Sequence, residues 1–259
     1  MPALALATTR HDGPEGRRPA LIVHGLFGSA RNWNVIAKKL SATRPVLAVD
    51  MRNHGDSPRD PAHGYPEMAE DLAAVIEGAG GAADVIGHSM GGKAAMQLAL
   101  TRPDLVGRLV VADIAPVAYS HTQTPLIDAM AALPLDGLTS RRDADAALAA
   151  AVPDAGTRAF LLQSLDLRAE GGPRWKLNLP VLKAEMDRII GWPGTAGRFE
   201  GPTLVLSGGA SSYVLPAHRP LFDALFPAAR HVALPGVGHW LHAEAPAEFL
   251  AALAAFLDA

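Results

Sequence analysis

The chain has 259 residues, of which 49% are hydrophobic and 19% are charged, and its formal net charge is −3. This balance predicts a folded globular protein and argues against a disordered chain or a basic nucleic-acid-binding protein. The absence of cysteine excludes disulfides, a thiolate metal site and a thiol nucleophile. Because no apolar run reaches membrane-spanning length and the N-terminus lacks a signal-peptide pattern, we expect a cytoplasmic monomer or homodimer that acts on a small molecule.

In chain order, short apolar runs alternate with segments of helical spacing. The runs are rich in β-branched residues and bounded by Gly or Pro, as is typical of parallel strands covered on both faces. This alternation predicts an α/β fold with one mostly parallel sheet. Residues 3–10 are expected to add an antiparallel edge strand. The predicted strands are residues 19–25, 44–50, 83–89, 107–113, 202–208 and 230–236, and the predicted helices are 32–40, 65–77, 90–100, 220–226 and 246–257.

The alternation stops after Asp113 and resumes near Pro202. The intervening sequence has helical periodicity throughout, with Pro and Gly at its joints. A run of helices inserted between two strands of one sheet would lie over the carboxyl ends of the strands. We therefore predict a core of residues 1–114 and 199–259 and a helical cap of residues 115–198.

Residues 87–94, GHSMGGKA, fit two different chemistries. The pattern G-x-S-x-G places Ser89 on a tight turn between a strand and a helix, as a nucleophile requires. The pattern G-x-x-x-x-G-K fits a phosphate-binding loop, with the strand that ends at Asp113 as its magnesium partner. Ala94 argues against the second interpretation, because a Ser or Thr there would supply the hydroxyl that binds Mg²⁺.

A serine nucleophile also needs a base and an oxyanion hole. His239, in GVGHW after the last predicted strand, is our candidate base because it comes last in the chain order of serine, acid and histidine. For the oxyanion hole, the motif HGLFGS turns the backbone amide of Leu26, or that of Phe27, toward the sheet edge, and the amide of Met90 is the second donor.

Other histidines are assigned structural roles. His242 forms an HxxH pattern with His239, but two ligands without a third make a weak metal site, so we predict no metal. His88 is expected to pack or to form hydrogen bonds away from the nucleophile. His54, in MRNHGDS, is expected to order its loop.

The motifs HGLFGS, DMRNHGDSP, GHSMGG and GHW, in this order, resemble the α/β-hydrolase superfamily along nearly the whole chain. VADIAPVAY, RWKLNLPVL and SGGASSYV are similar to the esterase group that includes YbfF-type proteins and their mitochondrial abhydrolase relatives. The resemblance implies an α/β-hydrolase fold and an esterase that needs no cofactor.

The triad acid departs from the common pattern of the superfamily. Ser211 stands where many members carry an aspartate after the strand at 202–208. Asp113 ends the neighbouring strand, and strands about 5 Å apart would let its carboxylate reach the imidazole. The resemblance to YbfF-type esterases supports this assignment, with Asp187 as a weaker rival. Arg52 is expected to order its loop, with contact to an acidic substrate group as the alternative.

Together these residues predict a serine carboxylesterase for small to medium acyl esters, or acyl thioesters, acting through an acyl-enzyme. A C–C bond hydrolase or a perhydrolase would use the same triad, and a non-hydrolytic ligand sensor is the remote alternative. We assign Trp175 to a helix of the cap and expect it to face the substrate. The predicted apolar lining of the pocket is Phe27, Met90, Tyr119, Trp175, Trp192, Val214 and Trp240.

Overall fold

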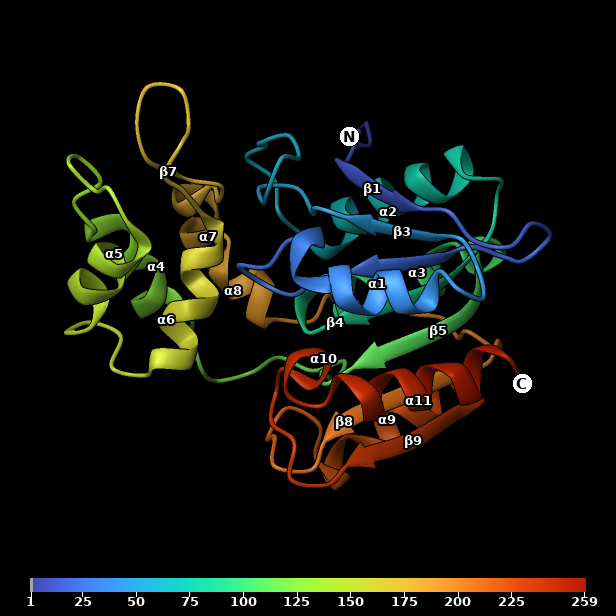
Figure 1. Cartoon of the computed structure of the whole chain (residues 1–259). Coiled ribbons are helices and arrows are strands. Elements are labelled where there is room, and N and C mark those ends of the chain that lie inside the picture. Colours follow the sequence, from blue (N-terminus) through green and yellow to red (C-terminus); the bar gives the residue numbers. More distant parts are fainter. Residues whose placement is uncertain (1) are drawn as a thin grey trace.

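The computed structural model describes residues 2–259, which form one seven-stranded sheet with helices on both faces (Figure 1). The strand order is β1-β3-β2-β4-β5-β8-β9, and only β1 runs antiparallel to its neighbour. The predicted α/β class and the antiparallel first strand are confirmed. The strands are β1 (Thr8–His11), β2 (Ala20–Val23), β3 (Val46–Val49), β4 (Ala83–His88), β5 (Val106–Ala112), β8 (Thr203–Gly208) and β9 (Ala229–Leu234).

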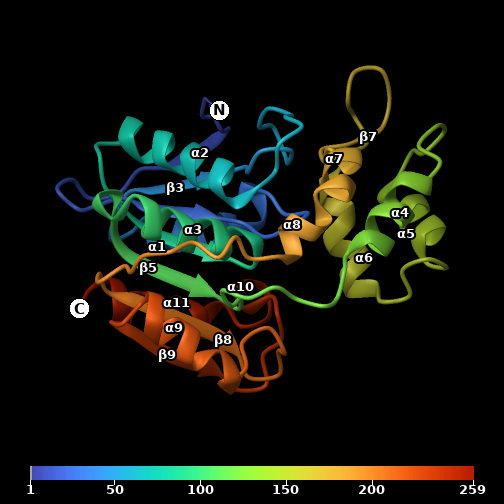
Figure 2. The ribbon, with the colours of Figure 1, turned by 180° about the vertical axis from the view of Figure 1, so that it is seen from behind.

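The central strands are buried on both faces because their side chains alternate between two apolar cores. In β2, Leu21 and Val23 join the core that includes residues of α2, α3 and α9, whereas Ile22 joins the core beneath α1 and α11. Figure 2 shows α2, α3 and α9 on the face opposite to α1 and α11. These helices are α1 (Asn34–Leu40), α2 (Tyr65–Gly78), α3 (Met90–Thr101), α9 (Arg219–Leu225) and α11 (Pro246–Leu257), with the short α10 (Leu241–Glu244) before α11.

Residues 115–198, named here the inserted segment, leave the core after β5 and return before β8. Figure 1 shows this segment beyond the carboxyl ends of the parallel strands, where the arrowheads lie. Its helices are α4 (Thr124–Ala132), α5 (Arg141–Leu148), α6 (Ala155–Leu161), α7 (Leu179–Ala184) and α8 (Met186–Ile190). Short 3₁₀ helices are η1 (Ala30–Trp33), η2 (Pro103–Leu105), η3 (Leu162–Ser164) and η4 (Pro216–His218).

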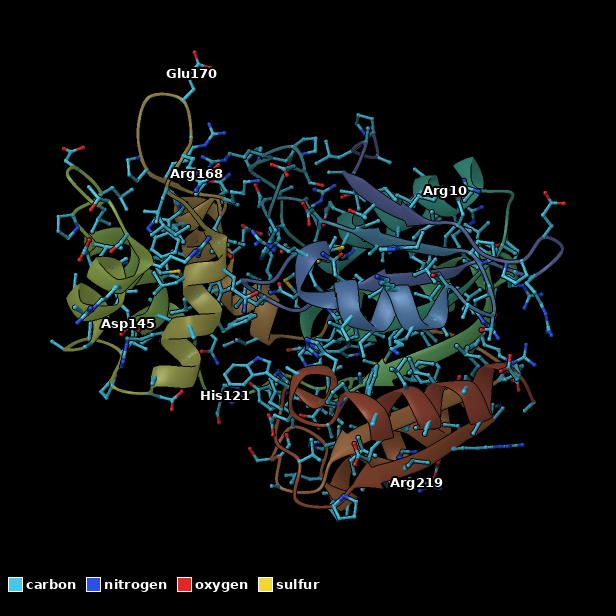
Figure 3. All side chains as sticks on the ribbon, in the orientation of Figure 1. Arg10, His121, Asp145, Arg168, Glu170 and Arg219 are labelled. Atoms are coloured by element: carbon cyan, nitrogen blue, oxygen red, sulfur yellow. The ribbon has the colours of Figure 1, made fainter. Side chains whose placement is uncertain are left out.

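The prediction that the inserted segment is helical throughout is wrong for one hairpin. Strands β6 (Leu165–Asp166) and β7 (Arg174–Trp175) pair antiparallel, and Figure 3 shows Arg168 and Glu170 on the loop that projects between them. Gly171 and Gly172 both have positive φ, which suits a turn rather than a helix. Trp175 therefore lies in a strand.

The strand β9 also differs from expectation, because it is the edge of the sheet rather than a fully buried strand. Only β8 pairs with it, and most of its side chains are exposed or half-buried. The strand contains Arg230 and His231 and is less apolar than β2 or β3, which agrees with its position at the edge.

The helices of residues 2–259 include none with both the length and the apolar character needed to cross a membrane. The longest of them, α2, has 14 residues and carries Glu67, Glu70 and Asp71. A bilayer-spanning helix needs about 20 mostly apolar residues.

Candidate active site

Ser89 occupies a strained turn between β4 and α3. Its backbone has φ 53° and ψ −121°, a conformation that costs free energy for any residue with a side chain. Two glycines make the turn possible: a Cβ at Gly87 would overlap the backbone of Gly91, and a Cβ at Gly91 would overlap the backbone of β2. The sequence pattern G-x-S-x-G thus has a steric cause in this fold.

The hydroxyl of Ser89 begins a chain of hydrogen bonds across the carboxyl ends of the strands. Its oxygen lies 3.1 Å from Nε2 of His239, and Nδ1 of His239 lies 2.7 Å from Oδ2 of Asp113. Because the carboxylate accepts the hydrogen of Nδ1, the lone pair of Nε2 is free to take the hydroxyl proton. The structure therefore brings together the three residues that the sequence predicted as a triad.

Asp113 directly follows β5, has φ 48° and is completely buried. The amide of Gly208 donates to its Oδ1 over 2.9 Å, and the hydroxyl of Ser211 donates to its Oδ2. These bonds, with that of His239, compensate for removing a carboxylate from water. Ser211, which stands where many superfamily members carry the acid, contacts this carboxylate, whereas the rival Asp187 is exposed on α8.

The segment after β2 passes close to Ser89. A Cβ at Gly25 would lie 3.0 Å from the Ser89 Cβ, so this approach requires glycine. Phe27 has φ 65°, and its amide donates to Nε2 of His54 over 3.2 Å. Among residues 2–259 neither the Leu26 amide nor the Met90 amide has a protein acceptor, so both N–H groups are available to a ligand.

Two contacts from distant parts of the chain hold the backbone of Phe27. Nδ1 of His54 donates to the carbonyl of Arg52 over 2.9 Å, which leaves Nε2 as the acceptor for the Phe27 amide. On the other side, the hydroxyl of Ser164 in the inserted segment donates to the Phe27 carbonyl over 2.8 Å. The sequence placed His54 in loop structure but gave no indication of this contact across 27 residues.

His24 supports the same segment and is neutral, like His54. Its Nε2 accepts the amide of Met51 over 2.9 Å, and its Nδ1 lies 2.8 Å from the carbonyl of Gly25. Burial lowers the pKa of His24 to about 4 and the pKa of His54 to about 3, because an imidazolium loses its hydration there. Both rings therefore keep these hydrogen bonds at neutral pH.

The remaining histidines beside the triad have packing roles, as predicted. Nε2 of His88 donates to the backbone carbonyl of His239 over 2.8 Å, which fixes the loop that carries the imidazole. His242 stacks on Trp33 with ring centroids 3.9 Å apart. The HxxH pattern therefore places its second histidine against an aromatic ring.

A cavity of about 330 Å³ lies over Ser89, with walls from both the core and the inserted segment. Of the predicted lining residues, Phe27, Met90, Tyr119 and Trp240 border it. Figure 3 shows His121, another lining residue, where the chain enters the inserted segment. Lining residues that the sequence analysis did not identify include Tyr65, Lys93, Leu126, Phe160, Ile189 and Ile190.

Three predicted lining residues lie elsewhere among the residues described. Trp175 is buried within the inserted segment, where its indole N–H donates to the carbonyl of Met130 over 2.9 Å. Trp192 packs with its ring centroid 6.4 Å from that of Tyr65. Val214 is also outside the lining, and it is the preceding residue, Tyr213, whose ring stacks on His239 at 4.0 Å.

Arg52 belongs to the structural framework of the core. It is 2% exposed and forms a bidentate pair with Asp71, at 2.7 and 2.8 Å. Its other donors bind the carbonyls of Ala62 and Glu67. Since these contacts engage the whole guanidinium outside the cavity, the alternative contact with an acidic substrate group is not supported.

The phosphate-loop interpretation of residues 87–94 also fails on geometry. Nζ of Lys93 donates to two backbone carbonyls of the inserted segment, and Asp113 binds His239 instead of facing a metal position. A phosphate loop would need the lysine directed to the ligand.

A mostly parallel sheet, with a strained strand-to-helix turn and a histidine and an aspartate at its carboxyl edge, defines an α/β hydrolase. The family model described as alpha/beta hydrolase fold matches residues 19–246, and the chain belongs to this family.

Relatives with named activities indicate which reaction the chain catalyses. The chain is 43% identical to mouse sn-1-specific diacylglycerol lipase ABHD11, over 92% of this chain and 81% of that protein. It is 39% identical to esterase YbfF of Escherichia coli, over 93% of each chain. A solved marine microorganism esterase superimposes with a TM-score of 0.93 at 35% identity, over 98% of this chain and all of that one. The protein is a carboxylic ester hydrolase.

Proposed function

We propose that the protein is a serine carboxylesterase in which Ser89 is the nucleophile, His239 the general base and Asp113 the orienting acid. The observation that carries this proposal is the unbroken chain of hydrogen bonds from the Ser89 hydroxyl through His239 to Asp113. Ser89, Asp113 and His239 each follow the carboxyl end of a different strand, β4, β5 and β9. The donors and acceptors are arranged so that the serine proton can move to Nε2 of His239.

The reaction follows from this polarity. Nε2 of His239 takes the Ser89 proton as Oγ attacks the ester carbonyl, and the amides of Leu26 and Met90 stabilise the oxyanion. His239 then donates the proton to the leaving alcohol, which leaves Ser89 acylated. Water, deprotonated by His239, attacks the acyl-enzyme, and His239 returns this proton to the Ser89 oxygen as the carboxylic acid leaves. These steps use only groups of the chain and water, so the proposed mechanism involves no cofactor.

The proposed substrates are small to medium acyl esters, with acyl thioesters as a second class. The cavity of about 330 Å³ is at the lower end of the range for small-molecule pockets, about 300–1,000 Å³. A relative is named as a diacylglycerol lipase and another as an esterase, and both names fit an acyl group held over Ser89. We assign residues 115–198 as a cap domain on a core of residues 1–114 and 199–259.

The proposed binding residues are those that border the cavity next to Ser89: Phe27, Tyr119 and Trp240 from the sequence prediction, with Tyr65, Ile189 and Ile190 added. The cytoplasmic location and the monomeric or homodimeric state remain predictions from the sequence.

Replacing Ser89 with alanine tests the nucleophile. We expect Ser89→Ala to lower kcat for a p-nitrophenyl ester by about 10⁶-fold, as the loss of a triad serine does elsewhere, and to abolish labelling by a fluorophosphonate. Ser41→Ala, at the end of α1 and far in the sequence from the triad, is the matched control and should keep both properties. Labelling of the Ser89→Ala variant, or turnover within tenfold of the wild type, would refute the assignment.

A further inference from the structure

Lys93 is a buried cation next to the nucleophile that the proposed mechanism does not use. It lies one helical turn after Ser89, at the start of α3, and is 1% exposed. Its ammonium donates to the carbonyl of Ile190 over 2.9 Å and to that of Gly191 over 2.5 Å. Within residues 2–259 no carboxylate pairs with it, so backbone carbonyls are its hydrogen-bond partners.

These carbonyls end the helix α8, where the last backbone oxygens have no partner within the helix and carry partial negative charge. Two tyrosines bind the same turn: the hydroxyl of Tyr65 donates to the carbonyl of Ile189, and the amide of Tyr119 donates to that of Ile190 over 3.0 Å. The aromatic rings also face the cation, with Nζ 4.7 Å from the centroid of Tyr119 and 5.7 Å from that of Tyr65. We name these contacts the α8 anchor.

The α8 anchor joins two walls of one cavity. Ile189 and Ile190 border the cavity from the inserted segment, and Lys93 borders it from the helix that begins at Ser89. A movement of the end of α8 would therefore change the room available to a substrate without moving the triad.

We propose that Lys93 is a positioning residue that fixes the end of α8 against the nucleophile helix and thereby sets which acyl lengths the cavity accepts. The inference rests on the proposed function, because it takes the cavity over Ser89 as the acyl site. Lysine suits this role because its long side chain reaches two successive carbonyls at once. An apolar side chain of the same length would leave both carbonyls without this donor.

Protonation leaves the anchor in place. Burial lowers the pKa of Lys93 to about 7, yet the neutral amine still has two N–H groups for the two carbonyls. The titratable groups that face Nζ are Tyr65 from α2 and Tyr119 before α4, and burial raises the pKa of both phenols, so they stay neutral. The proposal therefore requires the donor and its reach, whether or not the group is charged.

The first arm of the test measures the anchor without using activity. Lys93→Met should speed amide hydrogen exchange in residues 186–192 about tenfold relative to wild type, as the loss of a hydrogen bond at a helix end predicts. Lys183→Met is the matched control, because this exposed lysine of α7 pairs only with Asp128, at 2.6 Å. Tyr65→Phe, which removes only the hydroxyl bound to Ile189, provides a second variant if Lys93→Met does not fold. Exchange equal to wild type in residues 186–192 overturns the proposal.

The second arm measures kcat and KM for p-nitrophenyl acetate, butyrate and octanoate. Lys93→Met should raise KM for octanoate about tenfold while kcat for acetate changes less than threefold, because the proposal has the longer chain contact α8 and the acetyl group remain at Ser89. An equal loss of kcat on all three esters, with unchanged KM, overturns the proposal. If the wild type hydrolyses none of the esters and is not labelled by a fluorophosphonate, the proposed function fails, and the exchange arm still decides whether Lys93 holds α8.

Discussion

The sheet edge and the inserted segment build the two halves of the cavity in different ways. Within residues 2–259, the non-glycine residues with positive φ are Phe27, Asn53, Ser89 and Asp113, and all of them belong to the core. The inserted segment has positive φ only at glycines. Strained backbone persists only where surrounding contacts hold it in place. The core at the carboxyl ends of the strands is therefore the rigid half of the cavity.

The contacts across the boundary show how the second half is held. Side chains bind backbone carbonyls at Phe27 and at the end of α8, and the backbone of Asn53 accepts the amide of Asn178 over 2.9 Å. Such bonds contribute about 1 kcal/mol each and add to the apolar cluster that spans both parts. The comparison teaches that the reacting groups all belong to the part with strained backbone, whereas the cavity also takes lining residues from the part without it.

After the loss of the Ser89 nucleophile itself, the largest effect is expected at Asp113. Asp113→Asn should lower kcat about 10⁴-fold with little change in KM, because an amide in this position no longer sets the tautomer of His239. Asp128→Asn, on the exposed surface of the inserted segment, is the control. Steady-state kinetics on p-nitrophenyl butyrate measure both. A loss smaller than tenfold would mean that another residue is the acid, and that the core does not supply the whole triad.

The next effect concerns Lys93, the buried lysine between the two halves. The pKa of Lys93 is about 7 in the folded chain, below the usual 10.5 of the unfolded one. Between these values the unfolded state binds the proton and the folded state does not, so the free energy of unfolding should rise with pH across this window, by a few kcal/mol. Urea unfolding of wild type and Lys93→Met at pH 7, 8.5 and 10 measures the difference, and only the wild type should show the rise due to this group. Parallel curves would contradict it.

A smaller effect is expected at His54, which acts through the Phe27 amide. His54→Leu should lower kcat between about tenfold and a hundredfold with KM nearly unchanged, because the segment that carries the Leu26 amide loses an internal contact. His54→Gln retains an acceptor near the same place and should recover part of the rate. Thermal unfolding of both variants serves as the stability control. Equal rates for the two substitutions would argue that only packing matters at this position.

The smallest effect tests the corrected position of Trp175. Trp175→Phe removes the hydrogen bond to Met130 and should lower the free energy of unfolding by about 1 kcal/mol, with kcat and KM unchanged. Chemical denaturation and ester kinetics on the same preparation measure both quantities. A changed KM with unchanged stability would support the sequence prediction that this indole meets the substrate.

The sequence predicted the sheet and the triad because both depend on local patterns. The apolar run at 83–89 and the small residues around Ser89 specify a buried strand and a tight turn, wherever the remaining chain lies. Asp113 was preferred to Asp187 because it ends the strand beside the one that precedes Ser211, and because the resemblance to YbfF-type esterases supports an acid there. In these cases the chain order and the strand ends carried the information.

The rest of the site depends on contacts between segments that no local pattern encodes. In the sequence, Lys93 fits a phosphate-loop pattern. Its carbonyl partners lie at the end of α8, almost a hundred residues later, and depend on how that helix packs against α3. Trp175 was wrongly predicted to lie in a helix because the sequence around it has helical periodicity. It lies in a hairpin whose turn depends on Gly171 and Gly172. The sequence therefore predicted Tyr119 as a lining residue but not Tyr65, Lys93, Ile189 or Ile190, whose places depend on how α8 packs against the core.

The backbone of Phe27 is bound by the core at its amide, through His54, and by the inserted segment at its carbonyl, through Ser164. A displacement of Ser164 would therefore act on the backbone that follows the Leu26 amide. It follows that exchanging residues 115–198 between relatives would alter turnover as well as preference wherever the exchange displaces Ser164, whereas changes confined to the end of α8 would alter preference alone.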